Sequence, residues 1–171
     1  MTAHMVFVSS FESKSGNAIE KCAKRIAILR YGKENVPTIV NPHNLKHPLD
    51  ESSINDQTIV TDINIDNGDL QGAITAFRQN REASGKGKKR KESQVTQDTI
   101  KELLDSDFIN QYKDGIIHTK PVDLAYFDPD KKEWNIMELK AGGALDGDNA
   151  KANVNKLLTE FVGMNSNNCN A

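Results

Sequence analysis

Apolar residues recur at helical spacing near the start of the chain and again near its end. Between Ser15 and Gly32 an apolar residue occurs at every third or fourth position, which predicts a helix that Ser15 or Asn17 caps and Gly32 ends. Residues 149–163 show the same spacing behind Asp148. This second pattern predicts a closing helix with Asp148 as its cap.

The middle of the chain carries one strand pattern and two helical patterns. Residues 57–65 alternate between apolar and polar and are rich in β-branched side chains, so a strand is expected there. Residues 69–84 are expected to form a helix, and residues 95–112 a second, long helix with one apolar side. Residues 41–53 contain Pro42 and Pro48, which keep this segment in a loop.

Two further strand patterns lie on either side of a turn sequence. Residues 116–128 and 134–143 are strand-like, and the segment DPDKKE between them favours a turn. We therefore expect the two segments to pair as a β-hairpin. This succession of helices and strands predicts an α/β protein without internal repeats.

The composition is that of one ordinary globular domain over residues 1–171. The chain is 37% hydrophobic and 27% charged, and it is long enough to bury a real core. No apolar run is long enough to span a bilayer, and the first residues lack the features of a secretory signal, so we expect a cytoplasmic protein without a membrane partner. Cys22 and Cys169 lie far apart and indicate neither a disulfide framework nor a zinc site.

A net charge of −2 excludes a basic coat that would bind nucleic acid through bulk charge alone. Any such binding must be local, and residues 84–93 form the one strongly basic segment, which we expect to be a flexible loop. Its five cations are Lys86, Lys88, Lys89, Arg90 and Lys91. The loop is either a solvated linker between two helices or a contact to DNA phosphates.

Full charges inside the predicted hairpin form the candidate site. Strand side chains alternate between faces, so Glu138 and Lys140 share one face. A register that places Phe127 opposite Trp134 puts Asp123 directly opposite Glu138, with Cβ atoms roughly 4.5–5.5 Å apart. Two carboxylates in this position repel each other unless a positive charge lies between them.

A divalent cation would relieve this repulsion. Carboxylate oxygens with the remaining positions left to water and phosphate suit Mg²⁺. The alternative is a solvated strand face on which Asp123 takes part in ordinary cross-strand ion pairing. The small residues 141–143 directly after Lys140 favour a ligand site, because they permit close approach of a ligand or a neighbouring strand.

These residues carry a family resemblance. Asp123, fourteen residues, Glu138, one residue and Lys140 lie across a hairpin that precedes a helix, and Pro121 stands two positions before Asp123. The arrangement resembles the signature of the PD-(D/E)XK nuclease superfamily, and the run ELKAGGALD is similar to its type II restriction endonucleases. The resemblance implies a restriction-endonuclease-like core, with a central mixed β-sheet flanked by helices and a hairpin that carries the site.

The resemblance also implies a role for each site residue. Asp123 and Glu138 would hold one or two Mg²⁺ ions against the scissile phosphate, and the carbonyl of Leu139 would add a ligand. Lys140 would orient or activate the attacking water. Glu20, on the helix before the sheet, is the candidate for a further acidic residue, although an i,i+4 pair with Lys24 on a solvated face explains it equally well.

The implied activity is Mg²⁺-dependent hydrolysis of phosphodiester bonds in double-stranded DNA, by a homodimer on a short palindromic site. One alternative is a non-catalytic DNA-binding or dimerisation fragment of such an enzyme, and another is a nuclease that acts on structured or damaged DNA. The resemblance implies one more strand after the closing helix, but residues 163–171 contain no apolar segment to form it. Either another element fills that place or the chain is a shortened form of a longer enzyme.

Two histidines form a second candidate, which fails on spacing. His43 and His47 are four positions apart, but Pro42 and Pro48 forbid the helix that would bring both rings to one metal. They are expected to be loop histidines.

Overall fold

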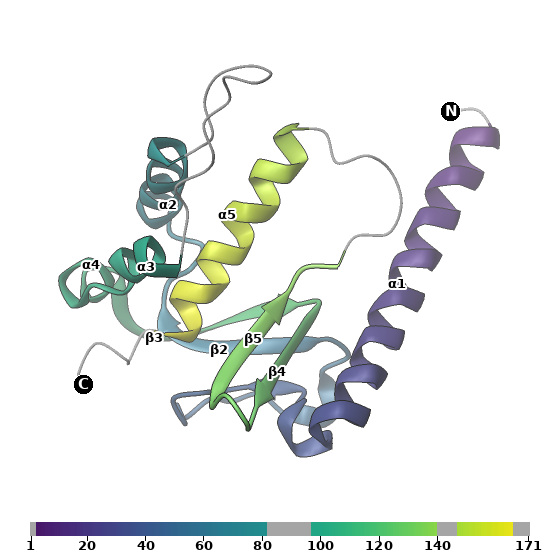
Figure 1. The fold of residues 1–171 in the computed structure, drawn as a ribbon, viewed down its shortest axis with the longest axis horizontal. Coiled ribbons are helices and arrows are strands. Elements are labelled where there is room, and N and C mark those ends of the chain that lie inside the picture. The colour runs from purple at the N-terminus through teal and green to yellow at the C-terminus, as the bar shows by residue number, and fades with distance from the viewer. Residues whose placement is uncertain (1–2, 82–96, 140–146, 166–171) are drawn as a thin grey trace. The chain divides into compact units, whose positions relative to one another are not determined.

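A computed structural model describes residues 3–81, 97–139 and 147–165 (Figure 1). Contacts divide the chain into two compact units, each assembled from several segments. The first unit comprises Met1–Val40, Leu49–Thr58 and Pro121–Ala150, and the second comprises Asn41–Pro48, Ile59–Lys120 and Lys151–Ala171. The predicted basic loop at residues 84–93 lies outside the described residues.

Helix α1 (Ala3–Tyr31) is the longest element of the first unit. It ends where predicted, because Gly32 has a φ of 90°, a left-handed conformation that glycine adopts without steric cost. The predicted start was wrong, since the helix begins at Ala3 and both candidate caps lie inside it. Asn17 points to solvent, and in that position a polar side chain does not compete with the helical hydrogen bonds.

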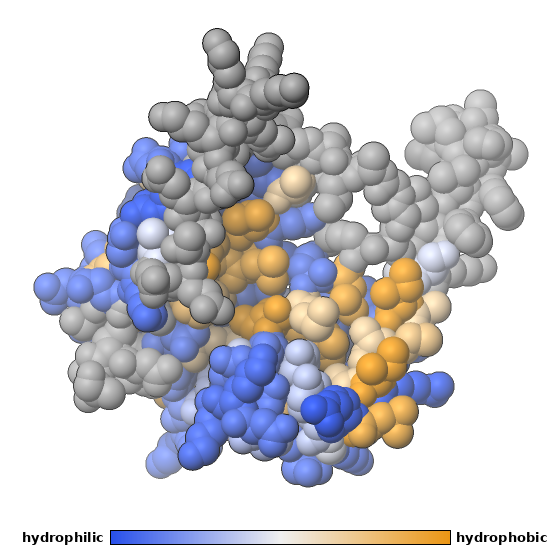
Figure 2. Space-filling model, viewed as in Figure 1, coloured by the Kyte–Doolittle hydropathy of each residue, from blue (hydrophilic) through white to orange (hydrophobic). Residues whose placement is uncertain are grey.

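One side of α1 packs on the hairpin strand β4 (Leu124–Asp128). Ala27, Val36 and Leu124 form a small core there, and Tyr31 stacks on Tyr126 with ring centroids 4.5 Å apart. Figure 2 shows hydrophobic residues over the C-terminal half of α1. Large aliphatic side chains are exposed on this helix, with Ile26 at 66% and Leu29 at 87%.

The strands form two sheets. Strands β1 (Ile39–Val40), β2 (Gln57–Ile63) and β3 (Lys113–Val122) make a three-stranded sheet in that order. In the described part of the chain, β4 pairs only with β5 (Glu133–Met137). The α/β class is confirmed. The single strand predicted for residues 116–128 was wrong, because the chain bends at Asp123 and passes from one sheet to the other. The hairpin therefore does not extend one central sheet among the described residues.

The second unit packs helices around a larger apolar core. Its helices are α2 (Gly68–Asn80), α3 (Gln97–Ile100), α4 (Ser106–Asn110) and most of α5 (Gly147–Met164), with a 3-10 turn at Lys101–Leu104. The fully buried members of the core are Ile63, Leu70, Ile74, Ile109 and Val162, among others. The long helix predicted for residues 95–112 was wrong. It is interrupted because the Asp105 side chain accepts hydrogen bonds from two backbone amides and so starts a new helix, α4.

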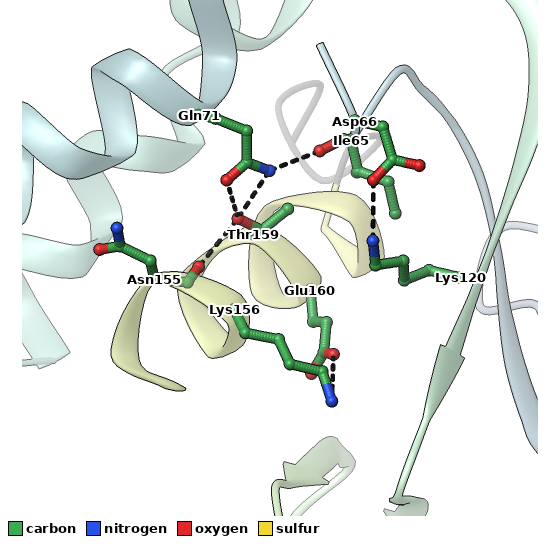
Figure 3. A network of polar contacts seen from close by, with 8 residues as sticks. All are labelled: Ile65, Asp66, Gln71, Lys120, Asn155, Lys156, Thr159 and Glu160. Carbon is green, nitrogen blue, oxygen red and sulfur yellow. Dashed lines mark hydrogen bonds and ion pairs between the residues drawn. The ribbon is translucent and has the colours of Figure 1, made fainter. Parts of the chain in front are cut away.

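Polar side chains join α2 to α5 within the second unit (Figure 3). Gln71 donates to the Ile65 carbonyl over 2.6 Å and to Thr159 Oγ1 over 3.3 Å, and the Thr159 hydroxyl donates to the Asn155 carbonyl over 2.8 Å. Arg78 donates to the Asn155 side chain over 2.8 Å. These bonds satisfy polar groups that would otherwise destabilise the buried helix interface.

The closing helix is confirmed, but its predicted cap was wrong. Helix α5 begins at Gly147 and therefore includes Asp148. The described part of the chain ends at residue 165, so the implied last strand stays a prediction. None of the helices described here combines the length and the apolar character needed to cross a membrane.

Candidate metal site on the hairpin

The pairing of β4 with β5 follows the predicted register. Phe127 lies opposite Trp134, and the last ladder pair is Leu124 with Met137. The Asp128 carboxylate fixes the turn, because its Oδ1 accepts hydrogen bonds from the backbone amides of Asp130 and Lys131. The ladder ends at the Leu124–Met137 pair, so the predicted pairing of Asp123 with Glu138, one step further, stays a prediction.

A hydrogen bond joins the segments on either side of the ladder's end, at Asp123 and at Leu139. The backbone N–H of Leu139 donates a 2.7 Å hydrogen bond to Oδ2 of Asp123. This bond joins the bend that follows β3 to the residues that follow β5. The Asp123 carboxylate therefore lies against the backbone next to Glu138 and not out in solvent.

Packing on α1 defines the two faces of the hairpin. Leu124, Tyr126 and Leu139 belong to the cluster around Ala27. Because strand side chains alternate, the other face is that of Ala125 and Ile136. Asp123 and Glu138 lie just beyond the paired strands, and their place on this face stays a prediction.

Burial strengthens the electrostatic argument for a cation. Asp123 and Glu138 are half-buried, and Oε1 of Glu138 is buried. Away from bulk water, the repulsion between two carboxylates is screened less, and so is the attraction of each for a cation. Two carboxylates with hard oxygen donors fit Mg²⁺, which is commonly held by one or two carboxylates together with water and phosphate.

A larger ligand set is not found in the part of the chain that the structure describes. No group of three or more His, Cys, Asp or Glu side chains there could hold a metal ion. Asp123 and Glu138 stay a predicted pair of ligands. Glu20 is half-buried on α1, and its membership of the site stays a prediction, as does the predicted role of the Leu139 carbonyl.

The predicted cations fall outside the described residues. Lys140 follows the last described residue of the hairpin, and the five cations of the basic loop lie between residues 82 and 96. Their predicted contacts with water and DNA therefore stay predictions.

The two loop histidines belong to the second unit. Nε2 of His43 and Nδ1 of His47 are buried and have no hydrogen-bond partner among the described residues. Burial lowers the pKa of His43 below its usual 6.5, and the charge of Lys113 adds to this, while the Met164 backbone and Asp62 act in the opposite direction. His43 is therefore a desolvated loop side chain and not a metal ligand in any three-residue group described here.

Sequence reasoning missed Gln57, a buried polar residue beside the hairpin. It is 2% exposed, and its side-chain amide makes hydrogen bonds to the backbone of Pro37 and Ala125. The sequence offered one signal, which is that the amide side chain of Gln57 directly precedes the strand residues TIV. Its partner lies 68 positions away in the chain, so the run itself could not identify the contact.

The chain was also compared with known proteins. No protein-family model, curated protein or solved structure matched it. The hairpin's own residues are thus the basis on which a function can be proposed.

Proposed function

We propose that this protein is a Mg²⁺-dependent DNA endonuclease, similar to type II restriction enzymes, that hydrolyses phosphodiester bonds in double-stranded DNA in the cytoplasm. The observation that supports this most is the hydrogen bond from the Leu139 amide to Asp123. It holds the Asp123 side chain against the segment that carries Glu138, directly beyond the last ladder pair of the Phe127–Trp134 register. Acidic residues opposite each other are unfavourable unless a cation joins them.

In the proposed mechanism, Asp123 and Glu138 would hold the metal ion against the scissile phosphate. When bound, Mg²⁺ acts as a Lewis acid on the phosphate and lowers the pKa of a bound water. The Lys140 ammonium orients the attacking water and offsets the charge that develops on the phosphate. The Leu139 amide holds Asp123 in place, so one chelating carboxylate is positioned before the substrate arrives.

DNA binding and assembly complete the proposal. The cations between Lys86 and Lys91 contact phosphates, which contributes affinity without sequence preference. A homodimer places two hairpins on the two strands of a short palindromic site, since a two-fold protein matches a two-fold DNA sequence.

Plasmid cleavage tests the proposal. The purified protein should convert supercoiled plasmid into discrete fragments with Mg²⁺ and not with EDTA. Asp123→Ala and Lys140→Ala should each reduce the rate by about 10²–10³-fold, the usual cost of removing one group that stabilises the transition state. Asp130→Ala and Lys131→Ala, on the exposed turn of the same hairpin, are the matched controls and should cleave normally.

Other outcomes identify the alternatives. If the protein shifts the mobility of DNA in a gel but yields no product, it is a binding fragment and not an enzyme. If it cleaves only mismatched or branched substrates, it acts on structured or damaged DNA. Equal cleavage by Asp123→Ala and by the wild type would place the chemistry elsewhere.

A further inference from the structure

Gln57 makes three hydrogen bonds through its buried side-chain amide. Nε2 donates to the carbonyl oxygens of Pro37 and Ala125 over 2.7 and 2.8 Å. Oε1 accepts from the backbone N–H of Ala125 over 3.0 Å. With only 2% of the residue exposed, water does not provide substitutes for these bonds.

Two of these bonds satisfy the backbone N–H and C=O of Ala125 on the edge of β4 that faces away from β5. In a strand, the N–H and the C=O of one residue point to the same side. Both groups of Ala125 point to Gln57, so they point away from Ile136, its register partner on β5. The side chain thus supplies the two hydrogen bonds that a neighbouring strand would supply.

Ala125 is two residues from Asp123 in the chain. The Asp123 carboxylate is itself held by the Leu139 amide on the β5 side. This segment is therefore held at two points, since Gln57 fixes the Ala125 backbone and the Leu139 amide holds the Asp123 side chain.

We propose that Gln57 is a positioning residue of the metal site, which sets the place of the Asp123 carboxylate relative to Glu138 by fixing Ala125. This proposal rests on the proposed function. A ligand group must be held within about 0.5 Å of its productive position, and the free Ala125 edge would otherwise leave two buried backbone groups unsatisfied. Gln57 touches neither metal nor substrate and acts only through Ala125.

The amide group makes a distinctive test possible. At neutral pH, Gln57→Glu replaces both donors with a carboxylate, which faces the carbonyl oxygens of Pro37 and Ala125. When protonated, the same glutamic acid can again donate to the Ala125 carbonyl and accept from the Ala125 N–H. The defect of Gln57→Glu should therefore diminish as the pH falls, which a purely structural loss of packing would not do.

The experiment compares Gln57→Glu with the wild type at several pH values. Calorimetry gives the Mg²⁺ affinity, plasmid cleavage gives kcat and KM, and NMR follows hydrogen exchange of the Leu139 amide without metal. At neutral pH we expect Mg²⁺ affinity and kcat to fall by about 10–100-fold, the usual effect of losing a group that supports a metal ligand. KM for DNA should stay unchanged, and the Leu139 amide should exchange faster.

Two controls make the result decisive. Gln79→Glu makes the same substitution at an exposed position of α2 and should behave as wild type. Gln57→Met removes all three hydrogen bonds without adding a charge, and it should show the same defect without recovery at low pH. Circular dichroism confirms that each variant is folded.

The outcomes separate this proposal from the proposed function. Normal Mg²⁺ affinity, kcat and Leu139 exchange in a folded Gln57 variant would overturn the positioning role while the wild type still cleaves DNA. If the wild type neither binds Mg²⁺ nor cleaves, the nuclease proposal fails, and faster Leu139 exchange in Gln57→Glu would still support control of the Asp123 position by Gln57. Failure of both Gln57 variants to fold would assign Gln57 to the fold alone.

Discussion

The Leu139 backbone amide lies 2.7 Å from Oδ2 of Asp123 and donates a hydrogen bond to it. Asparagine retains a side-chain oxygen that can accept this bond but removes the charge. We therefore expect Asp123→Asn to fold normally and to lose Mg²⁺ binding. Magnesium at 100 times its Kd should stabilise the wild type by about 2.7 kcal/mol and Asp123→Asn by close to nothing. Thermal unfolding with and without Mg²⁺ measures the difference.

Asp130→Asn is the matched control, since Asp130 is exposed on the turn between β4 and β5. It should keep the full stabilisation by Mg²⁺. Equal stabilisation of Asp123→Asn and the wild type would show that the metal binds away from the hairpin.

A pH dependence follows from the buried ring of His43, whose pKa is lowered below 6.5 mainly by desolvation. The unfolded chain takes up a proton as the pH falls through about 6.5, while the folded protein stays neutral at this position until the pH reaches the lower folded value. The free energy of unfolding should therefore decrease between these two values. Below both values, this contribution should stop changing.

Urea unfolding between pH 7 and pH values below 6.5 tests this prediction. His43→Asn, which cannot titrate, should lose less stability than the wild type over the same range. Asp62 and Lys113, the charges that act on His43, are intact in both proteins. Parallel curves for the two proteins would rule out His43 as the source.

Local signals in the sequence were enough to predict several elements. The turn sequence and the alternating strands predicted the hairpin register, because the turn length decides which residues pair. Gly32 ended the first helix for a reason that lies in its own backbone. The acidic pair Asp123 and Glu138 lies one step beyond the observed ladder and stays a prediction.

Other elements depended on contacts that the sequence does not display. The bend at Asp123 separates two sheets, and the alternation in residues 116–128 is the same whether the strand stays in one sheet or changes to another. Asp105 interrupted a convincing helical pattern because its side chain competes for backbone amides. Gln57 was missed because its hydrogen-bond partner Ala125 is distant in the chain.

Packing in the second unit predicts a large cost for one buried isoleucine. Ile74 on α2 is 0% exposed and belongs to the apolar core. Ile74→Ala removes buried methyl groups and leaves a cavity, so the free energy of unfolding should fall by about 2–5 kcal/mol. Ile26→Ala makes the same change on α1 at a residue that is 66% exposed, and it should alter stability by less than about 0.5 kcal/mol. Equal losses in urea unfolding, followed by circular dichroism, would contradict this assignment of the core.

The start of α2 depends on one capping side chain, and this gives the last prediction. Oδ1 of Asn67 accepts hydrogen bonds from the backbone amides of Asp69 over 2.8 Å and of Leu70 over 3.2 Å. Asn67→Ala removes both, so it should lower the free energy of unfolding by about 1 kcal/mol. Asn67→Ser retains an oxygen acceptor at the same position and should recover most of that loss. If urea unfolding finds serine as destabilising as alanine, the two hydrogen bonds do not stabilise the helix.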